Sequence, residues 1–192
     1  NGRRRQRQMC IRDSSKADIT FFSAGGKISE KYVSAAAKHT VVIDNSSYFR
    51  MDPDVPLIVP QVNSKEIKNM KKNILANPNC STAQLVIVLK SLHDNFKIKR
   101  LVISTYQSTS GAGKKPMDEL LNQTKKALES KEIKSENFTK QIAFNAIPHI
   151  DKFSTDGYTK EEIKMIQETN KILGSNIDCL LYTSDAADDD HC

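Results

Sequence analysis

The sequence predicts an α/β protein built around a parallel β-sheet. Short apolar stretches typical of strands alternate with stretches typical of helices along the 192 residues, and this alternation is typical of parallel sheets. Residues 40–44 form a continuous apolar run, as strands buried on both faces do. Three of the expected strands are followed by polar loops, at residues 23–26, 45–50 and 77–82. Because ligands of parallel sheets bind at the carboxyl ends of the strands, these loops are expected to converge on one crevice.

The elements can be assigned in order along the chain. Runs with the length and composition of short strands are residues 18–22, 40–44, 57–59, 74–76, 100–106 and 142–147. Stretches expected to be helices are approximately residues 29–39, 83–92, 116–128 and 159–173. Residues 129–140 are charged and have no such pattern, so a loop is expected there.

Start and stop signals support three of the helices. Ser29 is a plausible N-cap for the first helix, and Pro116 suits the first turn of the third. Thr159 and Glu162 have the spacing of a capping box at the start of the fourth helix. Gly174 is suited to end that helix, because glycine readily adopts the left-handed conformation of a helix C-terminus.

The second helix is expected to follow a turn that contains a cysteine, Asn77-Pro78-Asn79-Cys80-Ser81-Thr82. Asn79 is a good N-cap, because its side-chain oxygen can accept an amide proton of the first turn. Cys80 then lies at the first helical position, where free amides and the helix dipole favour the nucleophilic thiolate. The alternative is a small buried cysteine beside a turn, which is common in proteins.

Composition excludes several other kinds of protein. The four cysteines (Cys10, Cys80, Cys179 and Cys192) form no CxxC pair and have no metal-ligand spacing to the histidines, so no disulfide framework or metal site is expected. No apolar run is long enough to span a membrane, and the start has no apolar core of a signal peptide. A reduced, cytoplasmic protein that binds no membrane is therefore expected. The net charge of +6 comes partly from dispersed lysines, which also suit anionic substrates.

The two ends of the chain differ from its middle. Residues 1–15 contain five arginines, and residues 178–192 contain five aspartates. Neither segment shows a hydrophobic period, and both resemble translated adapter sequence, so we expect them to be non-native or disordered. The arginine segment could contact nucleic acid, but it lacks interleaved aromatic residues. No nucleic-acid partner is expected.

Residues 16–177 resemble the aspartate-semialdehyde dehydrogenase family. The matching strings occur in the family's order and with similar spacing. They are residues 22–26 (FSAGG), 42–47 (VIDNSS), 49–56 (FRMDPDVP), 77–82 (NPNCST), 104–107 (STYQ), 110–113 (SGAG), 143–148 (AFNAIP), 158–162 (YTKEE) and 168–171 (ETNK). No one string is decisive, but the set is highly specific.

The resemblance implies two partial domains. Residues 16–77 would be the C-terminal part of an NADP-binding, Rossmann-type domain with a partial parallel sheet. Residues 78–177 would be the N-terminal part of an α+β catalytic domain that also forms a homodimer interface. The implied reaction is the NADP-dependent reductive dephosphorylation of L-4-aspartyl phosphate to L-aspartate 4-semialdehyde, a step in the synthesis of lysine, threonine, methionine and diaminopimelate.

The resemblance also implies roles for single residues. Cys80 matches the nucleophile that forms a thioester, and Gln107 matches the residue that orients the acyl group. The matched substrate-binding residues are Arg50 and Lys164 for phosphate, Glu161 for the ammonium group, and Asn79 beside the nucleophile. The residues that match cofactor-binding loops are Ser23, Gly25, Gly111 and Gly113.

Two parts of the family pattern have no counterpart in the sequence. The glycine-rich pyrophosphate loop that opens the family's first strand–helix unit is not found. The downstream arginine for the substrate carboxylate and the general acid/base histidine seven residues later are not found either; His39, His93 and His149 do not match that position. We therefore expect this chain to be an internal fragment that is inactive alone.

Two alternatives remain at this point. One is a reductase similar to those acting on N-acetyl-glutamyl phosphate, although that substrate has no free ammonium group for Glu161 to bind. The other is a non-catalytic paralogue that keeps the fold as a binding module. The joint presence of Cys80, Gln107, Arg50, Glu161 and Lys164 favours the enzyme over the paralogue.

Overall fold

The computed structural model of this chain describes residues 16–186, which divide into two compact units. Residues 16–99 together with Met165–Ile177 form the first unit, and Arg100–Lys164 together with residues 178–186 form the second. The expected division between residues 77 and 78 does not coincide with these compact units and stays a prediction about the domains. Helix α4, which follows residue 79, packs into the first unit, because its Val86 is fully buried in that unit's core.

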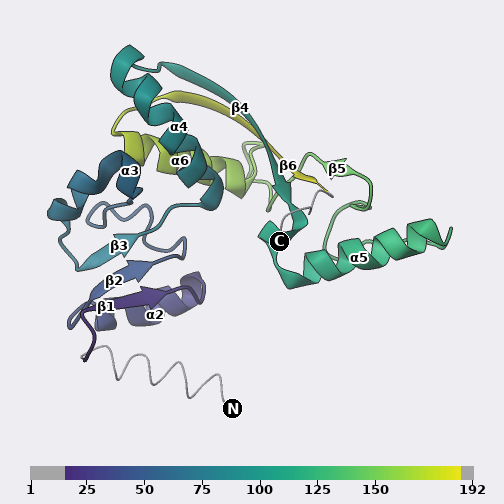
Figure 1. The fold of residues 1–192 in the computed structure, drawn as a ribbon, viewed down its shortest axis with the longest axis horizontal. Coiled ribbons are helices and arrows are strands. Elements are labelled where there is room, and N and C mark those ends of the chain that lie inside the picture. The colour runs from purple at the N-terminus through teal and green to yellow at the C-terminus, as the bar shows by residue number, and fades with distance from the viewer. Residues whose placement is uncertain (1–15, 187–192) are drawn as a thin grey trace. The chain divides into compact units, whose positions relative to one another are not determined.

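The first unit contains the predicted parallel sheet. Strands β1 (Ile19–Phe22), β2 (Val41–Asp44) and β3 (Ile74–Ala76) lie in the order β1-β2-β3, and both neighbouring pairs are parallel (Figure 1). Each strand falls within one of the predicted runs. The predicted strand at residues 57–59 is reduced to one parallel bridge between Leu57 and Ala76.

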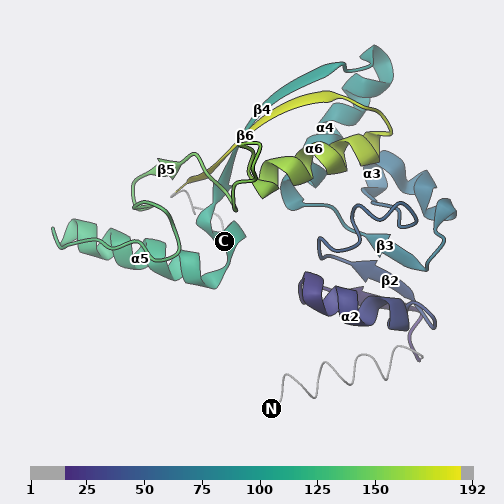
Figure 2. The same cartoon turned by 180° about the vertical axis from the view of Figure 1, so that it is seen from behind.

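Helices surround this sheet and close its core. They are α2 (Gly26–Ala36), α3 (Pro60–Asn63), the 3₁₀ helix η2 (Ser64–Asn69), α4 (Cys80–Phe96) and the larger part of α6 (Lys160–Leu173). Figure 2 shows α2 beside the sheet. The core joins Val33 of α2, Val42 of β2, Val86 of α4 and Ile172 of α6. No helix among residues 16–186 is long and apolar enough to cross a membrane.

Helix α2 begins three residues earlier than predicted, and Ser29 is not its cap. Gly25 occupies the N-cap position with a φ of 88°, a conformation that glycine adopts without strain. Ser29 is instead fully buried, and its Oγ donates a 2.7 Å hydrogen bond to Oδ1 of Asp44. The buried Asp44 carboxyl also accepts from the backbone N and the Oγ of Ser46. Ser29 therefore connects α2 to the end of β2.

Replacing Ser29 by alanine is expected to lower the free energy of unfolding by about 2 kcal/mol, because one hydrogen bond to a buried carboxyl is lost. Urea unfolding of Ser29→Ala and of the parent chain measures this difference. Ser47→Ala is the control, since Ser47 is exposed at the same loop. Equal losses in both variants would contradict a specific role for the Ser29–Asp44 bond.

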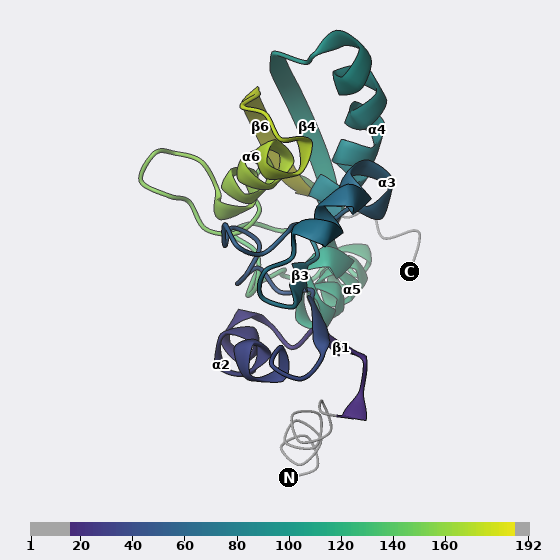
Figure 3. The same ribbon diagram turned by 90° about the vertical axis from the view of Figure 1, so that its left-hand side faces the viewer.

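The second unit contains a mixed sheet in the order β4-β6-β5. Strand β4 (Arg100–Ser108) pairs with β6 (Asp178–Ala186) in parallel, and β5 (Ala146–Ile147) pairs with β6 in the antiparallel sense. Figure 3 shows β4 and β6 side by side. The 3₁₀ helix η3 (Thr109–Ala112) follows β4 and leads into α5 (Lys114–Leu128).

Strand β6 corrects the prediction for the end of the chain. Residues 178–192 were expected to be non-native or disordered, but residues 178–186 form a strand whose Leu181, Thr183 and Asp185 are buried. The strand forms because β4 offers a complete ladder of backbone partners from Arg100 to Ser108, a contribution that local periodicity cannot reveal. Residues 1–15 and 187–192 lie outside the described residues, and a non-native origin of either segment stays a prediction.

The predicted strand at residues 142–147 is also shorter than expected. Only Ala146–Ile147 pair in a sheet. The backbone amides of Ile142 and Ala143 instead donate to Oε1 of Gln123 in α5, at 2.9 and 3.2 Å. Phe144 has a φ of 59°, which is incompatible with an extended strand. The buried side chain of Gln123 thus accepts the backbone hydrogen bonds that a neighbouring strand would otherwise accept.

The predicted signals of helix α6 are confirmed. The backbone N of Thr159 donates to Oε2 of Glu162 at 2.7 Å, and the backbone N of Glu162 donates to Oγ1 of Thr159 at 3.3 Å, which is the reciprocal pattern of a capping box. Gly174 follows the last residue of α6 with a φ of 68°. Local sequence alone therefore defined both ends of this helix.

Candidate active site

Hydrogen bonds join the three polar loops at the carboxyl ends of β1, β2 and β3. Nδ2 of Asn45, after β2, donates to Oγ of Ser23, after β1, at 3.2 Å. Nδ2 of Asn77, after β3, donates to Oδ1 of Asn45 at 2.7 Å. The expected convergence of these loops at one edge of the sheet is therefore confirmed within the first unit. Asn45 and Asn77 are the residues that connect them.

The cysteine turn places Cys80 at the first position of helix α4. Oδ1 of Asn79 accepts a 2.8 Å hydrogen bond from the backbone N of Ser81, so Asn79 is the predicted N-cap. Cys80 is exposed, whereas the second cysteine among residues 16–186, Cys179, is partly buried. Burial and the neighbouring charge of Asp178 raise the pKa of the Cys179 thiol above its ordinary value. The exposed cysteine at a helix start is thus the better placed nucleophile of the two.

Arg50 lies beside this turn and is almost fully buried. Its Nε donates to the backbone oxygen of Asn77 at 2.9 Å, and its Nη2 donates to the backbone oxygen of Asn45 at 3.2 Å. Its Nη1 forms a 3.0 Å ion pair with Oε1 of Glu168 in α6. A guanidinium held in this way is a rigid fork suited to phosphate or carboxylate oxygens. The structure therefore brings Arg50, Asn79 and Cys80 together within the first unit.

The predicted cofactor loop after β1 is open to ligands. Ser23 and Gly25 are exposed, and nothing within 4 Å surrounds the position where a Cβ of Gly25 would be. Gly25 begins α2, whose first-turn amides point to the same end of the sheet as the other loops. A helix start after a parallel strand is a common binding place for the phosphates of a dinucleotide. These residues fit such a group.

The second unit holds Gln107, Gly111 and Gly113. A Cβ at Gly111 would lie 2.6 Å from Cδ of Gln107, so Gly111 leaves the space that the glutamine side chain occupies. Gly113 begins α5 with a φ of 97° and has no atom within 4 Å of its Cβ position. The structure thus gives Gly111 a packing role with Gln107. Cofactor binding by Gly111 and Gly113 stays a prediction.

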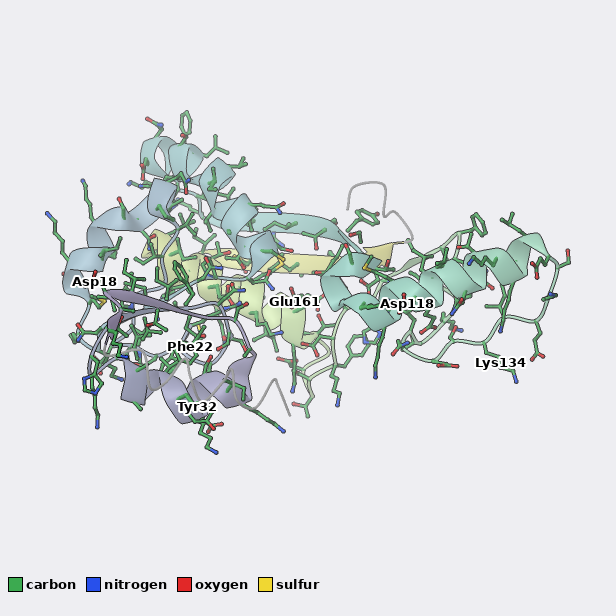
Figure 4. All side chains as sticks on the ribbon, turned by 60° about the horizontal axis from the view of Figure 1, so that its bottom comes forward. Asp18, Phe22, Tyr32, Asp118, Lys134 and Glu161 are labelled. Atoms are coloured by element: carbon green, nitrogen blue, oxygen red, sulfur yellow. The ribbon has the colours of Figure 1, made fainter. Side chains whose placement is uncertain are left out.

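Glu161 lies in the first turn of α6 (Figure 4), and Lys164 lies three residues further along the same helix and contacts it. Nζ of Lys164 lies 3.3 Å from Oε2 of Glu161 and 3.0 Å from Oδ2 of Asp151. Burial opposes the charge of Lys164, but the hydrogen bond to Asp151 and the charge of Glu161 together raise its pKa above the ordinary value. Lys164 therefore stays protonated, as an anion-binding lysine must.

The predicted site residues of the first unit thus lie in loops at one edge of its sheet. Those of the second unit form two groups, one with Gln107 and one with Glu161 and Lys164. A single site that joins the cysteine turn to Gln107, Glu161 and Lys164 stays a prediction. Sequence reasoning assigned no role to Glu168, which contacts both Arg50 and the backbone of Asn79. It belongs to a matched string, residues 168–171, but its separation from Arg50 by more than a hundred residues gave no local signal.

Two protein-family models match the chain. The NAD binding domain of semialdehyde dehydrogenase matches residues 4–70, and the semialdehyde dehydrogenase dimerisation domain matches residues 89–180. The chain belongs to the semialdehyde dehydrogenase family. Within this family it is a homologue of the aspartate-semialdehyde dehydrogenases, at about half identity over most of its residues.

Particular relatives show the extent of this similarity. The chain is 51% identical over 172 residues to the enzyme of Helicobacter pylori strain 26695, covering 84% of this chain and 50% of that protein. It is 58% identical over 159 residues to the enzyme of Aquifex aeolicus, covering 81% and 47%. The crystal structure of aspartate semialdehyde dehydrogenase II from Vibrio cholerae matches with a TM-score of 0.88 at 47% identity, covering 91% of this chain and 53% of that one. The chain spans about half the length of these relatives.

Proposed function

We propose that this chain is part of an enzyme that reductively dephosphorylates L-4-aspartyl phosphate to L-aspartate 4-semialdehyde with NADP as cofactor. The observation that carries the proposal is the hydrogen-bonded group of loops that presents Cys80 at a helix start beside the fork of Arg50. An acyl phosphate needs both features: a thiolate to attack the carbonyl carbon and a cation to hold the phosphate. The similarity to aspartate-semialdehyde dehydrogenases supports the same reaction.

Each residue then has a chemical role. The thiolate of Cys80 forms a C–S bond with the acyl carbon while the C–O bond to phosphate breaks, so inorganic phosphate leaves and a thioester remains. Arg50 and Lys164 hold the phosphate, Glu161 pairs with the substrate ammonium, and Gln107 orients the acyl group. When bound, the nicotinamide cofactor supplies the hydride that reduces the thioester. Ser23 and Gly25 would hold part of that cofactor after β1.

The preferred cofactor, the homodimer and the cytoplasmic location complete the proposal. NADP is proposed over NAD on the family resemblance. The outer face of the β4–β6 pair exposes Val102, Tyr106 and Tyr182, and such an apolar sheet face is suited to a second copy of the chain. A reducing compartment such as the cytoplasm keeps an exposed thiol such as that of Cys80 in its reduced, reactive form.

A hybrid enzyme tests the proposed reaction. Residues 16–177 replace the aligned segment of the Aquifex aeolicus enzyme, which supplies the regions that this chain does not match. We expect this hybrid to form NADPH from aspartate semialdehyde, phosphate and NADP, while the 192-residue chain alone does not. A folded hybrid without phosphate-dependent activity would contradict the proposal. Activity with N-acetyl-glutamate semialdehyde instead would assign the chain to the alternative substrate.

A further inference from the structure

We propose that Glu168 is a positioning residue that fixes both Arg50 and the cysteine turn of the active site. The inference deepens the proposed function and rests on it. Glu168 lies in α6 and is 1% exposed. Its Oε1 accepts from Nη1 of Arg50 at 3.0 Å, and its Oε2 accepts from the backbone N of Asn79 at 2.7 Å. Each carboxylate oxygen thus holds one part of the site.

The contact with Arg50 completes the restraint of its guanidinium. Backbone oxygens of Asn77 and Asn45 fix Nε and Nη2, and Glu168 fixes Nη1. A guanidinium has five N–H groups, and no partner among residues 16–186 takes the other two, one on each terminal nitrogen. The planar fork cannot turn without breaking all three bonds. Guanidinium N–H groups are suited to phosphate oxygens. The directions of the two remaining N–H groups are therefore set by Glu168 together with the two backbone oxygens.

The contact with Asn79 acts on the nucleophile's own turn. Asn79 is both the N-cap of α4 and the residue before Cys80. Its side chain accepts from the backbone N of Ser81, so holding its backbone N also holds the start of the helix. One buried carboxylate therefore couples the orientation of Arg50 to the position of the Cys80 backbone.

Attachment of α6 to the first unit does not require Glu168. Nζ of Lys171, one turn further along α6, donates to the backbone oxygens of Arg50, Asp52 and Val55 at 2.7, 2.8 and 2.9 Å. Ile172 belongs to the hydrophobic core of the same unit. Buried ion pairs contribute little net stability on average, because the loss of solvation offsets their attraction. The position of Glu168 is thus better explained by its contacts with Arg50 and Asn79 than by a need to attach α6 to the first unit.

Glu168→Gln separates the two contacts in the hybrid enzyme. The amide has one oxygen and one NH₂ group, so a donor must face either Arg50 or the N–H of Asn79, and one of the two hydrogen bonds is lost. We expect the KM for phosphate to rise roughly tenfold, the effect of one lost charge-assisted hydrogen bond, while the KM for aspartate semialdehyde changes less than about twofold. Glu168→Asp keeps both oxygens and should give a phosphate KM nearer to that of the parent hybrid.

Glu162→Gln is the matched control. Glu162 is another buried glutamate of α6 whose two carboxylate oxygens both accept from backbone amides, Oε2 from Thr159 and Oε1 from Thr183. Glutamine therefore loses one hydrogen bond there as well, but neither bond holds Arg50 or the cysteine turn. Thermal unfolding shows whether each variant is folded. If Glu168→Gln does not fold, Glu168→Asp becomes the test, and it must raise the KM for phosphate more than the KM for aspartate semialdehyde. Parallel changes in both KM values, or the same change in Glu162→Gln, would overturn the positioning role. A parent hybrid without activity would instead reject the proposed function itself.

Discussion

Cys80→Ser in the hybrid enzyme is expected to lower kcat by at least about 10³-fold, because loss of a covalent nucleophile removes the acyl-enzyme route. A serine hydroxyl at the same place is a poor nucleophile without an adjacent base. The exposed position of Cys80 at the start of α4, capped by Asn79, predicts this dependence. Steady-state formation of NADPH measures it. Ser91→Ala, an exposed change on the same helix, should leave kcat within about twofold of the parent hybrid.

The same cysteine can be tested in the 192-residue chain without any turnover. Iodoacetamide should modify Cys80 faster than Cys179, because Cys179 is partly buried and its thiol pKa is raised by burial and by Asp178. Mass spectrometry of the digested protein follows each thiol separately. Faster labelling of Cys179 would contradict the assignment of Cys80 as the reactive thiol. A hybrid whose kcat survives Cys80→Ser would reject the thioester mechanism as a whole.

Asp185→Asn is expected to stabilise the chain by up to about 3 kcal/mol at pH 7. Asp185 lies in β6 and is 6% exposed, and its Oδ1 has no hydrogen-bond partner among the described residues. Burial raises the pKa of Asp185 to about 6; the charge of His149 opposes this shift and that of Glu161 adds to it. Each pKa unit corresponds to about 1.4 kcal/mol, so a rise of about two units from the ordinary value gives the stated penalty.

The size of this effect depends on pH. Because the folded state holds the Asp185 proton more tightly than the unfolded state, stability should fall as pH rises from about 4 to about 6 and then stay constant with respect to this group. The gain from Asp185→Asn should therefore be near zero at about pH 4 and complete at pH 7. Urea unfolding at several pH values measures it, with the exposed Asp178→Asn as control. A gain that does not change with pH would show that Asp185 is not the titrating group.

Local sequence correctly predicted much of the fold and the nucleophile's setting. The strands at residues 18–22, 40–44 and 74–76, the cap at Asn79 and the capping box of Thr159 and Glu162 all depend on neighbours within a few positions of the chain. Hydrophobic periodicity and caps describe such short-range effects directly. The convergence of the three loops also followed from the sequence, because parallel strands necessarily place their carboxyl ends at one edge.

Other features depended on partners that are distant in sequence. Ser29 was expected to be a cap because serine favours that position. Its hydroxyl is instead buried and donates a hydrogen bond to Asp44, fifteen residues later. Gln123 satisfies the amides of Ile142 and Ala143 and so shortens a predicted strand. In each case a buried polar group had to be satisfied, and the nearest partner in space was not a neighbour in the chain.

The sequence by itself therefore determined the α/β class, both ends of helix α6 and the placement of Cys80 at a helix start. Only the tertiary structure decided that residues 178–186 form a strand, because that strand depends on the backbone ladder of β4. Only the tertiary structure revealed Glu168, which lies 118 residues from Arg50 and 89 from Asn79. Burial and hydrogen bonding between such distant residues arise when the chain folds, and no local pattern encodes them.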